Sequence, residues 1–355
     1  MTSAIIKTIE ISPVSFRLKN PFVTAAGRKN TTENVQITIH LSDGTRGVAE
    51  ASSSIAMPGE SQRNMIEALK DMVPELRGKS IDHYKELVEL CWRLQHYHPT
   101  AAAAMECAIL DAYTRTRRQP LTKFLGGKLS QVETDFTLSV ATPDILFKAA
   151  RAAARKGFRR LKVKLGGESV EKDLDRMKAV HRGAPTAALV ADGNQGLSVS
   201  HALQWAHQLE KAKIKLVFLE QPFRKHDIRA MKVFRSRNRL PLFADESVLT
   251  AHDAVKLFEA SAADGVNIKV AKSGLLGSLD IIRTAQRFGK RLAIGCMEES
   301  KLGLAASVHL ACGAGVFEWV DLDSVFLLES TSLRGGFLIK GPKLSVKGIG
   351  SGIGI

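Results

Sequence analysis

The chain has 355 residues, of which 45% are hydrophobic and 25% are charged, a mixture that is typical of globular proteins and excludes a largely disordered chain. This length allows two domains or one large barrel with additions. The formal net charge of +15 would suit a nucleic-acid partner. However, the Lys and Arg residues are dispersed, and their densest group, Arg115, Arg117 and Arg118, has no interleaved aromatic residues. We therefore expect no nucleic-acid partner.

The four cysteines, Cys91, Cys107, Cys296 and Cys312, have neither C-x-x-C spacing nor the spacing of metal ligands. They are typical of free thiols in a cytoplasmic protein. The first thirteen residues lack the basic and apolar regions of a signal peptide, and no stretch approaches the ~18 apolar residues of a membrane span. We expect a cytoplasmic protein without a membrane partner.

Residues 1–125 are expected to form an α+β capping domain. Apolar and polar residues alternate in three segments, which predicts an antiparallel meander over residues 5–11, 35–41 and 46–50. Two segments that we expect to be loops, 20–28 and 51–60, are rich in small and apolar residues, which suggests that they cover something. From 60 to about 123 the apolar residues have helical spacing.

Residues 126–330 change to short apolar strands that alternate with amphipathic helices, which favours a parallel (β/α)7β barrel of the modified TIM type. The strand candidates are 134–140, 160–165, 188–192, 216–220, 242–245, 266–269, 293–297 and 319–321. The tail, 331–355, reverts to strand and glycine-rich turn. We expect it to return to the capping domain and to pair with its sheet, which makes the fold α/β with a discontinuous α+β cap.

Charged residues stand at the carboxyl ends of seven consecutive strand candidates, where the active site of a parallel barrel lies. In chain order they are Lys162 and Lys164, Asp192, Glu220, Asp245, Lys269, Glu298, and Asp321 with Asp323. Alone, Asp192 or Asp245 could be a helix N-cap, and the two lysines could guard a solvated edge strand. Together, the charges indicate a site.

Three carboxylates, Asp192, Glu220 and Asp245, would repel one another in a closed pocket unless a cation lies among them. Hard oxygen ligands without His or Cys favour Mg²⁺, with one ion in each site. A lysine becomes a usable base when neighbouring cations and burial lower its pKa. Lys164 and Lys269, facing opposite sides of one carbon, could then remove a proton from one face and return it to the other.

Five short motifs, K-V-K at 162–164, D-G-N-Q at 192–195, E-Q-P at 220–222, D-E-S at 245–247 and N-I-K at 267–269, resemble the ordered signature of the enolase superfamily in its muconate-lactonizing subgroup. The resemblance covers nearly the whole chain. It implies Mg²⁺ ligands at Asp192, Glu220 and Asp245, and Lys164 with Lys269 as the acid/base pair that acts through an enediolate. Lys162 would tune Lys164 and help to bind the substrate carboxylate.

The motif Asp321-Leu322-Asp323 resembles the Asp-x-Asp of dipeptide epimerases, which receives the α-ammonium group of the substrate. A buried ammonium needs an anionic partner, so the chemistry agrees with the resemblance. A solvated acidic strand end is the alternative. We therefore expect an isomerase that inverts the α-carbon of the C-terminal residue of a dipeptide.

The preferred side chain stays open. Arg28, in the loop that also carries Thr24, resembles an arginine that pairs with the glutamyl carboxylate in Ala-Glu epimerases, although the loop here is one residue longer at Gly27. Glu298 would instead repel a glutamyl side chain and attract a cationic one, unless it is a solvated rim charge. We expect Thr24, Arg28 and Glu298 to line the substrate site.

The alternatives are a cycloisomerase or o-succinylbenzoate synthase of the same subgroup, and, from another class, a catalytically silent barrel that binds a partner. Asp321 and Asp323 argue against the first, because those substrates carry no ammonium group. The capping helices could pack within the chain or between subunits, so the sequence leaves a homo-oligomer open.

Overall fold

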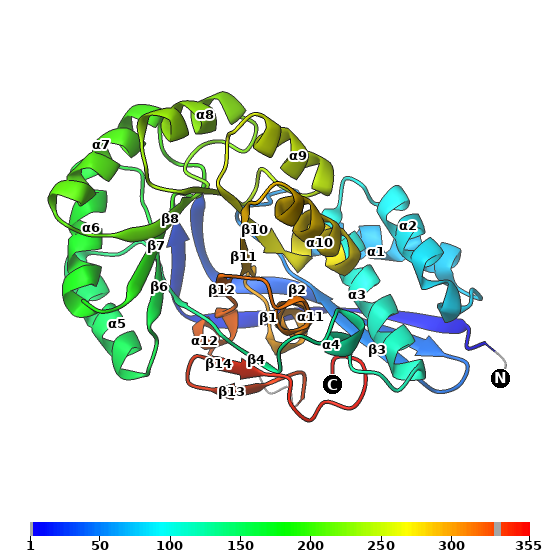
Figure 1. Cartoon of the computed structure of the whole chain (residues 1–355). Coiled ribbons are helices and arrows are strands. Elements are labelled where there is room, and N and C mark those ends of the chain that lie inside the picture. Colours follow the sequence, from blue (N-terminus) through cyan, green and yellow to red (C-terminus); the bar gives the residue numbers. More distant parts are fainter. Residues whose placement is uncertain (1–2, 330–334) are drawn as a thin grey trace.

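The computed structural model describes residues 3–329 and 335–355. It has an antiparallel sheet of three strands at the N-terminal end, followed by helices and then a parallel barrel (Figure 1). The strands of the first sheet are β1 (Ile6–Thr24), β2 (Gly27–Leu41) and β3 (Arg46–Ala51), in that order. This is the predicted meander.

The hairpin of β1 and β2 is longer than predicted, since the segment 20–28 is its tip and not a loop. Phe22, Val23 and Thr24 pair with Lys29, Arg28 and Gly27. A shift in register between Arg17 and Phe22 accommodates Asn20-Pro21, because proline has no N–H group to donate to the ladder. The predicted loop 51–60 follows β3 and is irregular, as expected.

Helices follow the first sheet. They are α1 (Gln62–Leu76), the short 3₁₀ turn η1 (Ile81–His83), α2 (Tyr84–Leu94), α3 (Pro99–Thr116) and α4 (Leu121–Phe124). Helices α1 and α3 pack on the sheet, and α2 and α4 pack on α3. The alanine-rich α3 is buried almost throughout, and it approaches β3 so closely that a Cβ atom at Gly47 would overlap the carbonyl oxygen of Ala108. Of the helices in the described ranges, none is long and apolar enough to cross a membrane.

Eight parallel strands form the barrel sheet, in the sequential order β5 to β12 (Figure 1). They are β5 (Phe136–Leu138), β6 (Arg160–Lys164), β7 (Ala188–Asp192), β8 (Leu216–Glu220), β9 (Leu242–Ala244), β10 (Gly265–Lys269), β11 (Arg291–Gly295) and β12 (Trp319–Asp321). Asp135 N–H donates to Val320 O over 2.9 Å, which brings the last strand against the first. The predicted (β/α)7β barrel with a capping domain is confirmed.

Helices connect these strands and cover the outside of the barrel (Figure 1). They are α5 (Pro143–Arg155), α6 (Val170–Gly183), α7 (Val199–Lys211), α8 (Ile228–Arg237), α9 (Ala251–Glu259), α10 (Val270–Arg287) and α11 (Lys301–Ala314), with the short α12 (Ser324–Leu327) after β12. Inside the barrel, below the charged strand ends, Phe218 stacks on Phe243 at 4.0 Å between ring centroids, and Trp319 packs against Phe218. This apolar plug closes the lower end and confines polar chemistry to the upper one.

The tail differs from its prediction in one respect. Its strands β13 (Leu338–Lys340) and β14 (Lys343–Ser345) pair with each other, and β14 pairs with β4 (Gln131–Glu133) and not with the sheet of β1 to β3. The reason is that β4 offers an exposed edge immediately before the barrel. The last residues do reach the capping helices, since Ile353 N–H donates to the Asp111 carboxylate over 2.7 Å. The predicted domain boundaries at 125 and 330 stay predictions; residues 330–334 of the tail lie outside the described residues.

Candidate active site

A small cavity lies where the carboxyl ends of the barrel strands meet the capping domain. Its floor and walls carry charged side chains of the barrel, among them Lys162, Lys164, Lys269, Glu298, Asp321 and Asp323. The hairpin tip contributes Phe22, Thr24 and Ala26, and the loop after β3 contributes Ser54 and Ala56. The prediction that both segments cover something therefore agrees with their position over the strand ends.

Lys162 lies at the centre of the charged groups and is 1% exposed. Its ammonium nitrogen is 2.7 Å from Asp321 Oδ2, 2.8 Å from Glu220 Oε1 and 3.1 Å from Asp192 Oδ2. It thus contacts strands β7, β8 and β12 at once. Asn267 Nδ2 donates to the same Glu220 oxygen over 2.9 Å. One buried cation therefore holds three of the predicted site carboxylates together.

Lys164 projects from the same face of β6 as Lys162, because residues two apart in a strand share a side. Its ammonium is 2.7 Å from Asp192 Oδ2, on the neighbouring strand, where Lys164 and Asp192 are register partners. The ring of Phe22, from the hairpin tip, lies 5.6 Å from the Lys164 nitrogen. The capping domain thus shields this lysine from water.

The other wall of the site is built around Asp245, which follows β9. Lys269 Nζ is 2.7 Å from its Oδ2 atom, and Lys272 Nζ is 2.6 Å from its Oδ1 atom. Lys272 also donates to the main-chain oxygen of Asp245. Gln221 fixes the backbone from the adjacent strand, since its side-chain oxygen accepts from Asp245 N–H over 2.9 Å. The orientation of this carboxylate is therefore set by three side chains.

Burial and the neighbouring lysines shift the pKa values of Asp192, Glu220 and Asp245 in different directions. Burial raises the pKa of Asp192 and Asp245, but the ammonium groups beside them outweigh it, so both pKa values lie below the ordinary range. For Glu220, burial outweighs Lys162 and raises the pKa to about 8. Burial lowers the pKa of Lys269, while the Asp245 carboxylate raises it and prevails. Asp192 and Asp245 are the anionic partners, and Glu220 is the group that most needs a further cation.

The donors suit a hard divalent cation. Asp192, Glu220 and Asp245 are buried carboxyl groups on three consecutive strands, and lysine ammonium groups hold the oxygens that such a cation would use. Beside Asp245, both side-chain oxygens of Glu246 are buried without a hydrogen-bond partner among the described residues. Burial, and then the charges of Asp245 and Asp192, raise the pKa of Glu246 to about 7. The site therefore has more buried carboxyl oxygens than its lysines neutralise.

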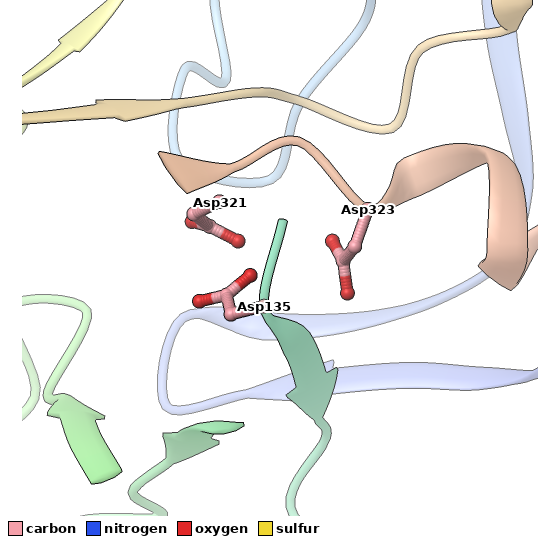
Figure 2. Close-up of side chains that lie close together, drawn as sticks. All are labelled: Asp135, Asp321 and Asp323. Atoms are coloured by element: carbon pink, nitrogen blue, oxygen red, sulfur yellow. The ribbon is translucent and has the colours of Figure 1, made fainter. Parts of the chain in front are cut away.

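A second group of carboxyl groups lies on the other side of Lys162. Asp135, Asp321 and Asp323 point toward one another, with oxygen atoms within 4.8 Å (Figure 2). Asp323 accepts from Thr137 N–H over 2.5 Å, and Asp135 accepts from the Trp319 indole over 2.6 Å. Burial, followed by the charge of Asp321, raises the pKa of Asp323 to about 7. A cation bound beside these three carboxyl groups would stabilise their charged forms.

The predicted substrate residues of the capping hairpin lie in different places. Thr24 lines the site cavity, but Arg28 is exposed and lines an adjoining groove together with Leu18 and Pro21. Its neighbour Lys29 faces the site instead, 3.8 Å from Glu298 Oε2 and 2.9 Å from Ser53 O. Strand alternation sends neighbouring residues to opposite faces. Glu298 therefore has a protein cation at its side, and the substrate-binding role of Arg28 stays a prediction.

Several site residues were missed from the sequence, namely Lys29, Asp135, Thr137, Gln221, Glu246, Asn267 and Lys272. Lys272 had a usable signal, because it follows the predicted site residue Lys269 by only three positions. Glu246 and Gln221 adjoin predicted ligands. Asp135 directly precedes the first barrel strand and Thr137 lies within it, and no charged residue was expected from this strand.

Comparison with known proteins agrees with this geometry. Residues 6–126 match the family described as mandelate racemase / muconate lactonizing enzyme, N-terminal domain, and residues 145–355 match the enolase C-terminal domain-like family. The aromatic dipeptide epimerase of Herpetosiphon aurantiacus is 33% identical to this chain, and the alignment covers 99% of both. The L-Ala-D/L-Glu epimerase of Thermotoga maritima is 34% identical, over 96% of this chain and 99% of that protein.

Solved structures give the same result. A substrate-liganded complex of the L-Ala-D/L-Glu epimerase from Bacillus subtilis has a TM-score of 0.96 at 30% identity, covering 99% of this chain and 98% of that one. The dipeptide epimerase of Enterococcus faecalis, complexed with Mg and L-Leu-L-Tyr, has a TM-score of 0.94 at 28% identity, covering 99% of both chains. The predicted superfamily, subgroup and isomerase class are confirmed. The chain belongs to the mandelate racemase / muconate lactonizing enzyme family.

Proposed function

We propose that this protein is a Mg²⁺-dependent dipeptide epimerase that inverts the α-carbon of the C-terminal residue by a two-base proton transfer. The observation that carries the proposal is the placement of Lys164 and Lys269. They end β6 and β10, which are separated by β7, β8 and β9 in the eight-stranded order. Four steps around an eight-stranded barrel lead to the opposite side, so the two lysines face one central space from opposite walls.

Each lysine would serve one enantiomer. A cation bound at Asp245 would oppose the charge that raises the pKa of Lys269. The neutral amine of one lysine would then accept the α-proton, and the ammonium of the other would deliver a proton to the opposite face of the same carbon. Asp192 holds Lys164 at 2.7 Å and Asp245 holds Lys269 at 2.7 Å, so both nitrogens have fixed positions. Fixed positions are what proton transfer requires, because a misplacement of about 1 Å costs on the order of 10²-fold in rate.

Asp321 and Asp323 would bind the α-ammonium group of the dipeptide. Both line the cavity, and the carboxyl group of the buried Asp135 lies behind them, with its oxygen within 4.8 Å of theirs. An ammonium group donates three hydrogen bonds, and in a site sheltered from water it needs anionic acceptors. This charge argues against the cycloisomerase alternative, whose substrates lack the group.

Asp192, Glu220 and Asp245 would hold the metal ion. When bound, Mg²⁺ supplies a positive charge that stabilises the negative charge developing on the substrate carboxylate as the α-proton leaves. Lys162 would remain between Glu220 and Asp321, 2.8 Å and 2.7 Å from their oxygens, where it separates the metal ligands from the ammonium subsite.

The side chain of the epimerised residue is left open between an acidic and a cationic preference. The two relatives at 33% and 34% identity differ in this respect, one being named for aromatic dipeptides and the other for L-Ala-D/L-Glu. Glu298 favours a cationic side chain, whereas Lys29 beside it partly cancels that charge. We further propose a cytoplasmic enzyme with no nucleic-acid or membrane partner, either monomeric or homo-oligomeric.

Incubation with a library of L-Xaa-L-Xaa dipeptides and Mg²⁺ in D₂O tests the function and the side-chain preference together. The expected result is conversion of the L,L dipeptide to a mixture of L,L and L,D epimers, with deuterium at the α-carbon of the C-terminal residue. Lys164→Ala and Lys269→Ala should each abolish epimerisation but retain exchange of one enantiomer, a different one in each variant. Epimerised product that retains hydrogen at this carbon would contradict the two-base scheme.

A further inference from the structure

Helix α10 is two helices and not one. Gly274 has φ 66° and ψ −177°, which interrupts the helical path between a first turn, 270–273, and a longer helix, 275–287. The first turn follows directly on Lys269 and carries Lys272. Both lysines contact the Asp245 carboxylate. The direction of this short turn therefore determines whether Lys269 and Lys272 can contact it at the same time.

The Glu106 carboxylate, from α3 of the capping domain, occupies the interruption. Its Oε1 atom accepts from Leu276 N–H over 2.7 Å, and its Oε2 atom accepts from the Trp92 indole over 2.6 Å. The start of a helix leaves N–H groups without partners, and an anion there is favourable. Glu106 is 0% exposed, and burial raises its pKa to about 7, although these donors lower it.

Gly274 and Glu106 fit each other. A Cβ atom at Gly274 would overlap the Glu106 carboxylate, and the φ of 66° is one that other residues adopt at a cost. The carboxylate can therefore reach the start of the second helix only because residue 274 is glycine. The interruption is held by a contact between two domains that are far apart in sequence.

We infer that Glu106 is a positioning residue for Lys269 and Lys272. It touches neither lysine and acts by fixing the interruption of α10, which directs the first turn and both ammonium groups onto Asp245. The inference rests on the proposed function for the roles of Lys269 and Asp245. It assigns the capping helix α3 a part in setting one wall of the active site.

Glu106→Gln, which keeps the shape of the side chain, is the test variant. Asp111→Asn is the control, because Asp111 is a fully buried acid of the same helix whose partners, Val48 N–H, Ile353 N–H and the Arg115 guanidinium, all lie outside α10. Two quantities are measured: the dissociation constant for Mn²⁺ without substrate, by electron paramagnetic resonance, and the ratio of α-hydrogen exchange in D₂O between the two enantiomers at saturating Mg²⁺.

In Glu106→Gln the Mn²⁺ dissociation constant should rise roughly tenfold, as for other supports of metal ligands. The exchange ratio should shift about tenfold or more against the enantiomer that Lys269→Ala also fails to exchange. Asp111→Asn should change neither quantity, even where it lowers the melting temperature as much. Gly274→Ala, which displaces the same carboxylate from the other side, should give the same two changes as Glu106→Gln. If Glu106→Gln does not fold, Gly274→Ala is the test variant in its place.

Wild-type values in Glu106→Gln, or equal changes in Glu106→Gln and Asp111→Asn, would overturn the inference. A wild-type protein that exchanges no dipeptide α-hydrogen would refute the proposed function instead. The Mn²⁺ titration would still report on Glu106 in that case, because it needs no substrate.

Discussion

Lys162 and Lys164 place their ammonium nitrogens 3.1 Å and 2.7 Å from the same oxygen atom, Asp192 Oδ2. Two cations thus share one carboxylate oxygen. Lys162 has two further carboxylate partners, Glu220 and Asp321, whereas Lys164 has Asp192 alone among the described residues. Lys162 is therefore held by three carboxylates at the centre of the site, whereas Lys164 is held by one.

Replacement of Lys162 should destabilise the metal-free protein. Lys162→Met leaves buried carboxylates without their cation, which should lower the free energy of unfolding by about 3–5 kcal/mol. Millimolar Mg²⁺ should raise the melting temperature of this variant by more than it raises that of the wild type. Thermal unfolding with and without Mg²⁺ checks this. Lys164→Met is the control and should lose less, because one carboxylate is affected; equal losses would contradict the central role of Lys162.

Asp323 should determine recognition of the free α-ammonium group. Asp323→Asn is the cleaner variant of the pair, because Asp321 also neutralises Lys162. Loss of a charge-assisted hydrogen bond should lower kcat/KM for a free dipeptide roughly 10- to 100-fold. The comparison is kcat/KM for the N-acetylated dipeptide, which should change little. A parallel fall for both substrates would place Asp323 outside the ammonium subsite.

Glu298 should disfavour dipeptides with an acidic side chain on the epimerised residue. Glu298→Gln removes a buried negative charge from the cavity wall, so the ratio of kcat/KM for acidic over cationic dipeptides should rise about tenfold. Lys29→Met should move the same ratio in the opposite direction, because it removes the cation 3.8 Å from Glu298. Steady-state assays with both dipeptides give the ratio. An unchanged ratio in both variants would mean that the pair lies outside the side-chain subsite.

His309 should make the protein sensitive to acid. The imidazole is fully buried; its Nδ1 atom accepts from Thr122 N–H over 3.1 Å, and its Nε2 atom lies 3.0 Å from Gly336 O. A backbone donor at Nδ1 excludes a proton there, and burial lowers the pKa to about 4 from 6.5. Between these values the unfolded chain binds more protons than the folded one, so stability falls as the pH falls.

The loss for His309 should approach roughly 3 kcal/mol across this pH range. Urea unfolding from pH 7 to pH 4 measures it. His309→Gln can retain both hydrogen bonds without titrating, so its stability should depend less steeply on pH over the same range. Identical slopes for the variant and the wild type would show that other groups cause the acid sensitivity.

The sequence was most informative about the barrel. Residues such as Asp192, Glu220 and Lys269 end apolar runs of five residues, and a parallel barrel gathers strand ends at one rim whatever the loops do. Predicted and observed strands accordingly agree within a few residues. The roles of these side chains as ligands and bases stay predictions, because contacts with lysines alone do not test them.

The capping domain was harder to predict because its register depends on distant contacts. Pro13 and Asn20-Pro21 are typical of strand ends, yet β1 continues past both, because Pro13 pairs with Val35 and pairing with β2 resumes at Phe22. The faces of Arg28 and Lys29 depend on that pairing, since a shift of one residue exchanges them. Lys272 reaches Asp245 only because α10 is interrupted at Gly274, and nothing local to the sequence indicates where Glu106 lies.

The long β1–β2 hairpin has a consequence for how such an enzyme can change. Its tip supplies Phe22, Thr24 and Ala26 to the cavity, while the barrel strands supply the lysines and carboxylates. The cover of the cavity and its charged groups are thus encoded in segments that are more than a hundred residues apart in the chain. Phe22 lies against Lys164, but single substitutions at Thr24 or Ala26 can change the shape of the cavity while every charged side chain of the barrel stays the same.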